Sequence, residues 1–369
     1  MRVPKINHFK IMNKYNFLVL LCLSLSMAAC QKAESDSTKT ATTTHATAPK
    51  PVDLATKCLS LNKQLKQFTQ QGITPKQLIA FNTELKQCVA HVPLEQRYEW
   101  LDATSKLYQK FIGQYESQEI DEYFSHIIDE AWLNQNYESL SERNKIREEA
   151  LEERKKIWGK LTKQQRFIIK NLKLLYLDDY YLGEGEFTLT QHPRYDVEMF
   201  ASHLPEADQA YLKQNLSEYY GKNIDLDAGL SISFKELAKR LLFWEKYQIQ
   251  FPNSHFHKQV VDNIKDYRSL LLLGLENTPV IMSYYEDPSI FVDPDALRSI
   301  TQVSQANSTS SPIAQKFLQI IQQNQLAWQQ LHTTENLDEE KQQNDKQVFF
   351  EQVTKQVRAL VDQADALTQ

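Results

Sequence analysis

The stretch from residue 178 to residue 186 carries the residue types that glycan chemistry requires. Its sequence, DDYYLGEGE, places the carboxylates of Asp178, Asp179, Glu184 and Glu186 beside the aromatic rings of Tyr180 and Tyr181. Hydrolysis of a glycosidic bond needs one carboxylic acid and one base or nucleophile, and sugar rings stack on aromatic side chains. One interpretation is therefore the catalytic site of a glycan-directed hydrolase, or the site of a glycan binder. The alternative, which we favour, is the end of a helix followed by a solvated acidic loop.

Other residue constellations that could do chemistry are weak. The sequence contains no G-x-S-x-G, H-E-x-x-H, P-loop or G-x-G-x-x-G motif. Glu122, His126 and Glu130 have the spacing of one helix face and could begin a metal site, but hydrogen bonds along a helix surface explain this ladder more simply. His255 and His257 are two residues apart, so they would point in different directions on a helix. We therefore predict no metal and no cofactor.

The N-terminal residues have the composition of a secretory leader. An apolar run from Phe17 to Met27 follows Lys14 and precedes two alanines. The run is shorter than the ~20 residues that a membrane-spanning helix needs. A basic flank, a short apolar stretch and small residues together predict a signal peptide over residues 1–29. Met12 is an alternative start to Met1, because it leaves a compact basic segment before the run.

The end of the leader, Leu25-Ser26-Met27-Ala28-Ala29-Cys30, resembles the lipobox of bacterial lipoproteins. The resemblance covers the leader alone, and Met27 departs from the leucine usual at its position. It implies that Cys30 is the first mature residue and carries lipid, palmitate among its acyl chains, which anchors the protein durably to a membrane. Gln31 in place of an aspartate implies the outer membrane, facing the periplasm, with the inner membrane or surface display as alternatives. Plain secretion after Ala29 is the other interpretation.

The charge of the mature chain excludes one class of partner. Residues 1–29 contain four basic residues and no acidic one, so their removal leaves 38 basic and 47 acidic residues and a net charge of −9. A protein with this balance is a poor candidate for binding nucleic acid or for a polybasic membrane contact. We therefore predict no nucleic-acid partner and membrane association through the lipid anchor.

The two cysteines of the body, Cys58 and Cys88, are predicted to form a disulfide. Apolar residues recur around each at spacings of three and four, which indicates two helices. Gly72 suits the end of the first helix, and Thr74 to Gln77 has the spacing of a capping box with proline at the first helical position. Each cysteine lies 14 residues from this turn, so an antiparallel hairpin brings the two to the same height. A redox-active pair is the alternative, but no C-x-x-C motif supports it.

The rest of the chain predicts an all-α fold of stacked helical hairpins, similar to a helical repeat, with one disulfide. Residues 30–51 form a flexible tether rich in Thr, Ser, Ala and Lys. An N-terminal helical region over 52–182, an irregular connection over 183–205 and a C-terminal helical region over 206–369 follow. The irregular connection is a loop or short hairpin at its start. The turn YQIQFPNS at 247–254 resembles the inter-helix turn of tetratricopeptide-type envelope lipoproteins, which implies stacked hairpins and transfers no function.

The last helix and the missing catalytic motif shape the functional expectation. Six apolar residues near the C-terminus are spaced three or four apart, and they either close the protein's own core or dock a partner (Phe350, Val353, Val357, Leu360, Ala364 and Leu367). We favour a membrane-tethered, non-enzymatic scaffold that binds another cell-envelope protein, in an assembly, secretion or immunity role. The alternative is the peptidoglycan-directed hydrolase or binder that uses the 178–186 stretch.

Overall fold

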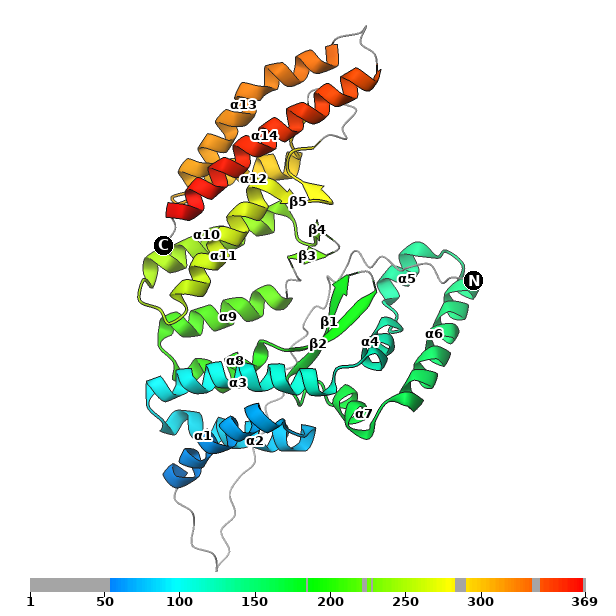
Figure 1. The fold of residues 1–369 in the computed structure, drawn as a ribbon, viewed down its shortest axis with the longest axis vertical. Helices are drawn as coiled ribbons and strands as arrows, with labels where there is room; N and C mark the ends of the chain where they lie inside the picture. Colours follow the sequence, from blue (N-terminus) through cyan, green and yellow to red (C-terminus); the bar gives the residue numbers. More distant parts are fainter. Residues whose placement is uncertain are drawn as a thin grey trace, which may run out of the picture.

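The computed structural model describes residues 54–183, 185–220, 224–226, 228–282, 290–333 and 339–367. Cys30 lies outside these residues together with the predicted leader and tether, and so does Glu184. Over the described ranges the chain forms fourteen α-helices and three two-stranded antiparallel ladders, which confirms the all-α class (Figure 1). Across the same residues, no helix is both long enough and apolar enough to span a bilayer.

The N-terminal hairpin forms as its sequence predicts, from α1 (Leu54–Gln71) and α2 (Pro75–Cys88). Gly72 has a φ of 85°, in the left-handed region that favours glycine. The Thr74 side chain accepts from the backbone N–H of Gln77, and the Gln77 side chain accepts in return from the backbone N–H of Thr74. The Cα atoms of Cys58 and Cys88 are 5.4 Å apart and the two residues are bonded, so the predicted disulfide is confirmed.

A third helix carries the chain across this hairpin into a side arm (Figure 1). Helix α3 (Leu94–Tyr115) packs on α1, and the arm then runs through four helices to the hairpin β1–β2. Most side chains of the long charged helix α6 are exposed, as expected for a solvated face. The arm consists of α4 (Gln118–Ser125), α5 (Glu130–Asn136), α6 (Leu140–Lys160), α7 (Lys163–Lys170), β1 (Leu177–Gly183) and β2 (Glu186–Gln191).

The remaining helices stack into a column that continues from α3 to the far end of the molecule (Figure 1). Two hairpins dominate it, α10 with α11 and α13 with α14, and α12 packs between them. Two minor ladders close loops beside α10 and α11. The elements are α8 (Arg194–Met199), α9 (Glu206–Tyr220), β3 (Asp225–Leu226), β4 (Gly229–Leu230), α10 (Phe234–Gln250), α11 (His257–Leu273), β5 (Gly274–Leu275), β6 (Thr278–Pro279), α12 (Pro294–Ser304), α13 (Ser311–Thr333) and α14 (Glu339–Leu367).

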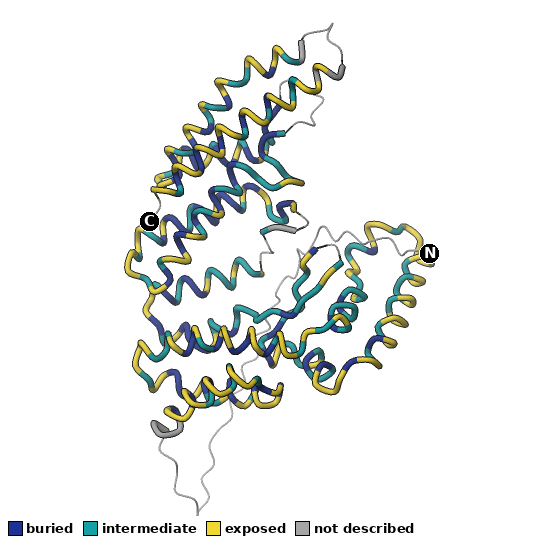
Figure 2. The backbone as a smooth tube through the Cα atoms, viewed as in Figure 1, coloured by how far each residue is buried: buried dark blue, intermediate teal, exposed yellow. Residues whose placement is uncertain are grey.

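The apolar seam of the last helix closes the core. One cluster of buried side chains extends from Cys58 on α1 to Val361 on α14, and Figure 2 shows buried residues recurring along the helices of the column. Val353 and Val357 are completely buried against the helices α11 and α13 that α14 contacts. The seam differs at its ends, because Phe349 rather than Phe350 is the buried ring and Leu367 is 85% exposed. The first of the two interpretations of this seam is the one that the fold supports.

Two local expectations are wrong. Residues 177–182, placed at the end of a helical region, form strand β1, because they pair with β2, whose sequence EFTLTQ alternates polar and apolar residues as a half-buried strand does. Glu122, His126 and Glu130 do not share a helix face, since α4 ends at Ser125 and α5 begins at Glu130. His126 is instead bonded through Nδ1 to the backbone carbonyl of Glu122.

Candidate functional site

Strand β1 separates the predicted carboxylate pair. Side chains alternate between the two faces of a strand, so Asp178 and Tyr180 share one face while Asp179 and Tyr181 share the other. Asp178 lies opposite Thr190 in the ladder, and Asp179 lies opposite the buried Leu189. The two carboxyls nevertheless stay neighbours, since the Asp178 carboxylate accepts a hydrogen bond of 3.2 Å from the backbone N–H of Asp179 and interacts with the Asp179 carboxyl.

The two aspartates have different surroundings. The Asp178 carboxylate accepts a hydrogen bond of 2.9 Å from the hydroxyl of Tyr219 on α9. Burial, together with the negative charge of Asp178, raises the pKa of Asp179 to about 6. Glu186, at the start of β2, is exposed, and Glu184 lies outside the described residues. Asp178 is thus hydrogen-bonded to Tyr219, a residue that lines a pocket.

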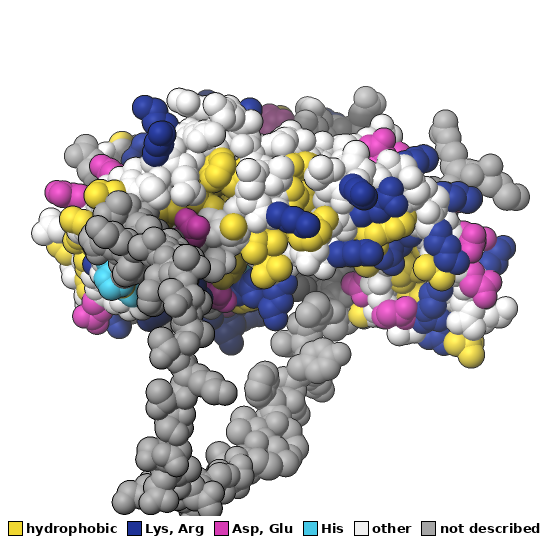
Figure 3. Space-filling model, turned by 90° about the horizontal axis from the view of Figure 1, so that it is seen from below, with side chains coloured by type: hydrophobic (Ala, Val, Ile, Leu, Met, Phe, Trp, Pro, Cys, Tyr) yellow, Lys and Arg dark blue, Asp and Glu magenta, His cyan; other side chains and the backbone are white. Residues whose placement is uncertain are grey.

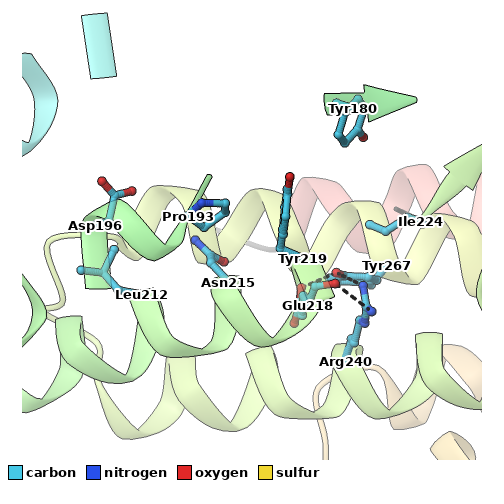
Figure 4. Close-up of a pocket in the computed structure, with 10 residues that line it drawn as sticks. All are labelled: Tyr180, Pro193, Asp196, Leu212, Asn215, Glu218, Tyr219, Ile224, Arg240 and Tyr267. Carbon is cyan, nitrogen blue, oxygen red and sulfur yellow. Dashed lines mark hydrogen bonds between the residues drawn. The ribbon is translucent and has the colours of Figure 1, made fainter. Parts of the chain in front are cut away.

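That pocket lies between the face of β1 that carries Tyr180 and the helices below it. It has a volume of about 400 Å³ (Figure 4). Five elements and two connecting segments contribute to it, which is why residues far apart in the sequence meet here. Its lining consists of Tyr180, Pro193, Asp196, Leu212, Asn215, Glu218, Tyr219, Ile224, Arg240 and Tyr267.

A hydrogen-bonded chain forms the floor of the pocket. The Arg240 guanidinium, 2% exposed, donates to the Tyr267 hydroxyl at 3.4 Å and to the Glu236 carboxylate at 3.1 Å. Tyr267 in turn donates to the carboxylate of Glu218 at 2.5 Å. Burial and the neighbouring Glu218 charge raise the pKa of Tyr267, so its hydroxyl stays a donor at neutral pH. Arg240 thus faces two carboxylates, Glu236 through an ion pair and Glu218 through charge attraction, so this network keeps a net negative charge.

The wall beside α8 contains an acid that is protonated near neutral pH. Asp196 lies on α8, and burial raises the pKa of its carboxyl to about 7. The residue as a whole keeps part of its surface exposed. A carboxyl with this pKa switches between hydrogen-bond donor and anion close to pH 7, and groups with such pKa values gather at functional sites.

Aromatic rings cluster around Tyr219, which lines the pocket. The Tyr219 ring lies 4.8 Å from the ring of His192, and Tyr220 lies 5.4 Å from the same histidine. Burial and the Asp178 carboxylate raise the pKa of Tyr219, and burial lowers the pKa of His192. The surroundings of Tyr180 and Tyr219 are therefore acidic and aromatic, as the sequence suggested for Tyr180 alone.

The pocket residues on α9, α10 and α11 were not predicted as site residues from the sequence. One signal was present: Arg240 interrupts the apolar stripe Leu237–Leu241–Trp244 of a helix, and a charge in a core stripe requires buried partners. Glu218 and Tyr219 had no comparable signal. Tyr219 meets Asp178, 41 residues earlier, through tertiary packing alone.

His255, the first histidine of the predicted pair, has a structural role. The His255 ring stacks on the Tyr98 ring at 3.9 Å, and its backbone N–H donates to the buried Asp208 carboxylate. Ser254 and the Tyr98 hydroxyl of α3 donate to the same carboxylate, so Asp208, on α9, links the turn between α10 and α11 to α3. Within the described ranges, no three His, Cys, Asp or Glu side chains come together in a way that could hold a metal ion.

Comparison with known proteins gives no relative for this chain: no family model, no curated protein and no solved structure matches it.

Proposed function

We propose that this chain is a membrane-tethered lipoprotein of the cell envelope whose helical body binds another envelope protein. The tether and lipid come from the leader, where Leu25 to Cys30 resembles a lipobox. The binding role is supported by one observation above all, the acidic and tyrosine-rich pocket between β1 and α9.

The chemistry of the pocket indicates a basic segment of the partner. Tyr180, Tyr219 and Tyr267 offer aromatic faces, and the carboxylates of Asp178 and Glu218 offer negative charge. A lysine or arginine side chain gains both a cation–π contact and an ion pair in such surroundings. Tyrosines in pockets are also frequent anchors of protein interfaces.

The test is capture of the partner from native envelopes by crosslinking and pull-down, followed by the same experiment with pocket variants. We expect Tyr180→Ala to weaken the partner's affinity by about 30-fold, which corresponds to about 2 kcal/mol for an interface anchor. Tyr181→Ala, on the opposite face of the same strand, is the matched control and should keep the partner. Equal capture by wild type and Tyr180→Ala would contradict docking at the pocket, and the absence of any crosslinked protein would contradict the scaffold role.

The proposed anchor has its own test. Cys30→Ala should abolish acylation and move the protein from the detergent phase to the aqueous phase. If the variant stays with washed membranes, another segment anchors it.

Glycan binding in the same pocket is the second candidate. It is favoured by Tyr180 and Tyr219 beside Asp178, the combination of ring and hydrogen-bond acceptor that sugars use. Hydrolysis is less well supported, because it needs two carboxyls that flank one bond at a distance of about 5 Å or more, whereas the carboxyls of Asp178 and Asp179 interact directly with each other. Binding of soluble peptidoglycan fragments that is lost in Tyr180→Ala, with no protein captured, would favour this candidate over the first.

A further inference from the structure

Positive charge is concentrated at one end of this acidic protein. The segments 58–93 and 161–176 contain eight basic residues and one acidic residue, Glu84. They form most of α1, all of α2 and α7, and the turn that follows α7, and α2 contacts α7. The basic residues are Lys63, Lys66, Lys76, Lys86, Lys163, Arg166, Lys170 and Lys173.

The lysines of this basic face point to solvent. All seven are exposed, and Arg166 is half-buried. Figure 3 views the molecule from this end and shows Lys and Arg side chains across the middle of the face, with hydrophobic side chains between them. Among the ion pairs of the described residues, none involves these eight side chains, so their charge is not neutralised by neighbouring acids.

Exposed leucines accompany the cations. Leu59, 71% exposed, lies four and seven residues before Lys63 and Lys66, so the three side chains share one stripe of α1. Leu174, 54% exposed, follows Lys173 and borders a hollow of about 270 Å³ that Lys86 also lines. Cations interspersed with apolar side chains suit the boundary between lipid headgroups and acyl chains better than they suit a purely ionic partner.

The position of α1 brings this face toward a bilayer. The described fold begins at Leu54, in the helix that carries Leu59 and Lys63, so the preceding chain enters the molecule at the basic face. If Cys30 carries lipid, as proposed above, 24 residues separate the lipid from Leu54. The flexible tether that the sequence predicts here would have a mean reach of about 27 Å at that length. The far end of the column, α13 and α14, lies at the opposite end of the long axis (Figure 1).

We propose that this basic face, formed by α1, α2, α7 and the turn at 171–176, lies on an anionic phospholipid surface. The net negative charge of the chain does not oppose this contact, because charges farther than about 8–10 Å are screened at physiological ionic strength. The contact orients the column outward from the membrane and leaves the tyrosine pocket accessible. The tether alone limits only the distance between the helical body and the membrane, whereas this contact also sets the orientation of the body.

The experiment uses the chain from residue 31 onward, which keeps every described residue and lacks the lipidation site. Co-sedimentation is measured with vesicles of phosphatidylglycerol and phosphatidylcholine, and with vesicles of phosphatidylcholine alone. We expect binding to the anionic vesicles that weakens as salt is raised, and little binding to the neutral ones. Equal binding to both vesicle types, or to neither, would overturn the proposal.

Variants locate the contact. Each cation near an anionic surface contributes about fivefold in affinity, the equivalent of about 1 kcal/mol, so Lys63→Gln, Lys66→Gln and Lys173→Gln together should weaken binding about a hundredfold. The matched control replaces three cations, Lys341, Lys355 and Arg358, by Gln; all three are exposed on α14, which is not part of the basic face. Circular dichroism confirms that each variant folds. If control and triple variant lose equal affinity, the contact is not made by this face. Because no anchor is present and the pocket is unchanged, failure here leaves the proposed partner binding untouched.

Discussion

The carboxyl of Asp196 predicts a specific dependence of stability on pH. Its pKa is about 7 in the folded protein because of burial, against about 3.9 for an aspartate in an unfolded chain. Between these values the folded state holds a proton that the unfolded state has released, so stability falls as pH rises from about 4 to about 7. Above pH 7 both states are ionised, and the difference becomes constant. Asp196→Asn removes this titration and should stabilise the protein at high pH.

The size of the effect follows from the two pKa values. A difference of about 3 units corresponds to at most about 4 kcal/mol at pH 8. Asp196 keeps part of its surface exposed, and solvent reduces the energy, so we expect about 2 kcal/mol. With an unfolding entropy of about 0.6 kcal/mol/K for a chain of this size, Asp196→Asn should melt about 3 °C higher than wild type at pH 8.

Calorimetry of wild type and Asp196→Asn from pH 4 to pH 9 measures this difference. The two melting temperatures should coincide near pH 4 and separate through pH 7. Asp102→Asn, which alters an exposed acid on α3, is the control and should follow wild type at every pH. A constant offset between Asp196→Asn and wild type, or a lower melting temperature for the variant at pH 8, would refute the assignment of burial as the cause. Retained or lost partner binding by Asp196→Asn then reports whether the pocket uses this carboxyl.

Three further predictions concern the stability of the column and its hairpins. Replacing Cys58 and Cys88 by Ser should cost about 3–4 kcal/mol, from the entropy of a loop with a sequence separation of 30 residues, and denaturant unfolding with and without reductant measures it in variant and wild type. Arg268→Met should cost about 3–5 kcal/mol, because Glu245, 1% exposed, loses its cation; a double variant with Glu245→Gln should recover much of this, and equal losses in single and double variants would show that the pair is not coupled. Val357→Asp places a charge at a completely buried position of α14 and should lower the melting temperature markedly, whereas Leu367→Asp, at a position 85% exposed, should not; similar melting temperatures for the two variants would argue against α14 as part of the core.

The sequence predicted those elements whose signals are local. The capping box at Thr74, the proline that follows it and the glycine that precedes it define the turn between α1 and α2, and equal distances from that turn predicted the Cys58–Cys88 bond. The apolar spacing from Val353 to Leu360 located the buried side of α14. Each of these signals depends on the helical repeat and on residues within a few turns of one another, which is why the chain alone carries them.

The tertiary structure decided which polar and charged side chains lie next to one another. The sequence DDYY at 178–181 predicted an acidic and aromatic cluster, but only its pairing with β2 as a strand directs Tyr180 to the pocket and Tyr181 to the opposite face. Glu218, Arg240 and Tyr267 converge because α9, α10 and α11 stack, and a spacing of up to 49 residues leaves no pattern in one sequence. The same holds for charge: composition gave a uniformly acidic chain, and only the packing of α2 against α7 gathers eight cations on one face. Helical periodicity depends on residues close in the chain and can therefore be recognised in the sequence. The spatial neighbours of a side chain depend instead on contacts between elements that are far apart in the chain.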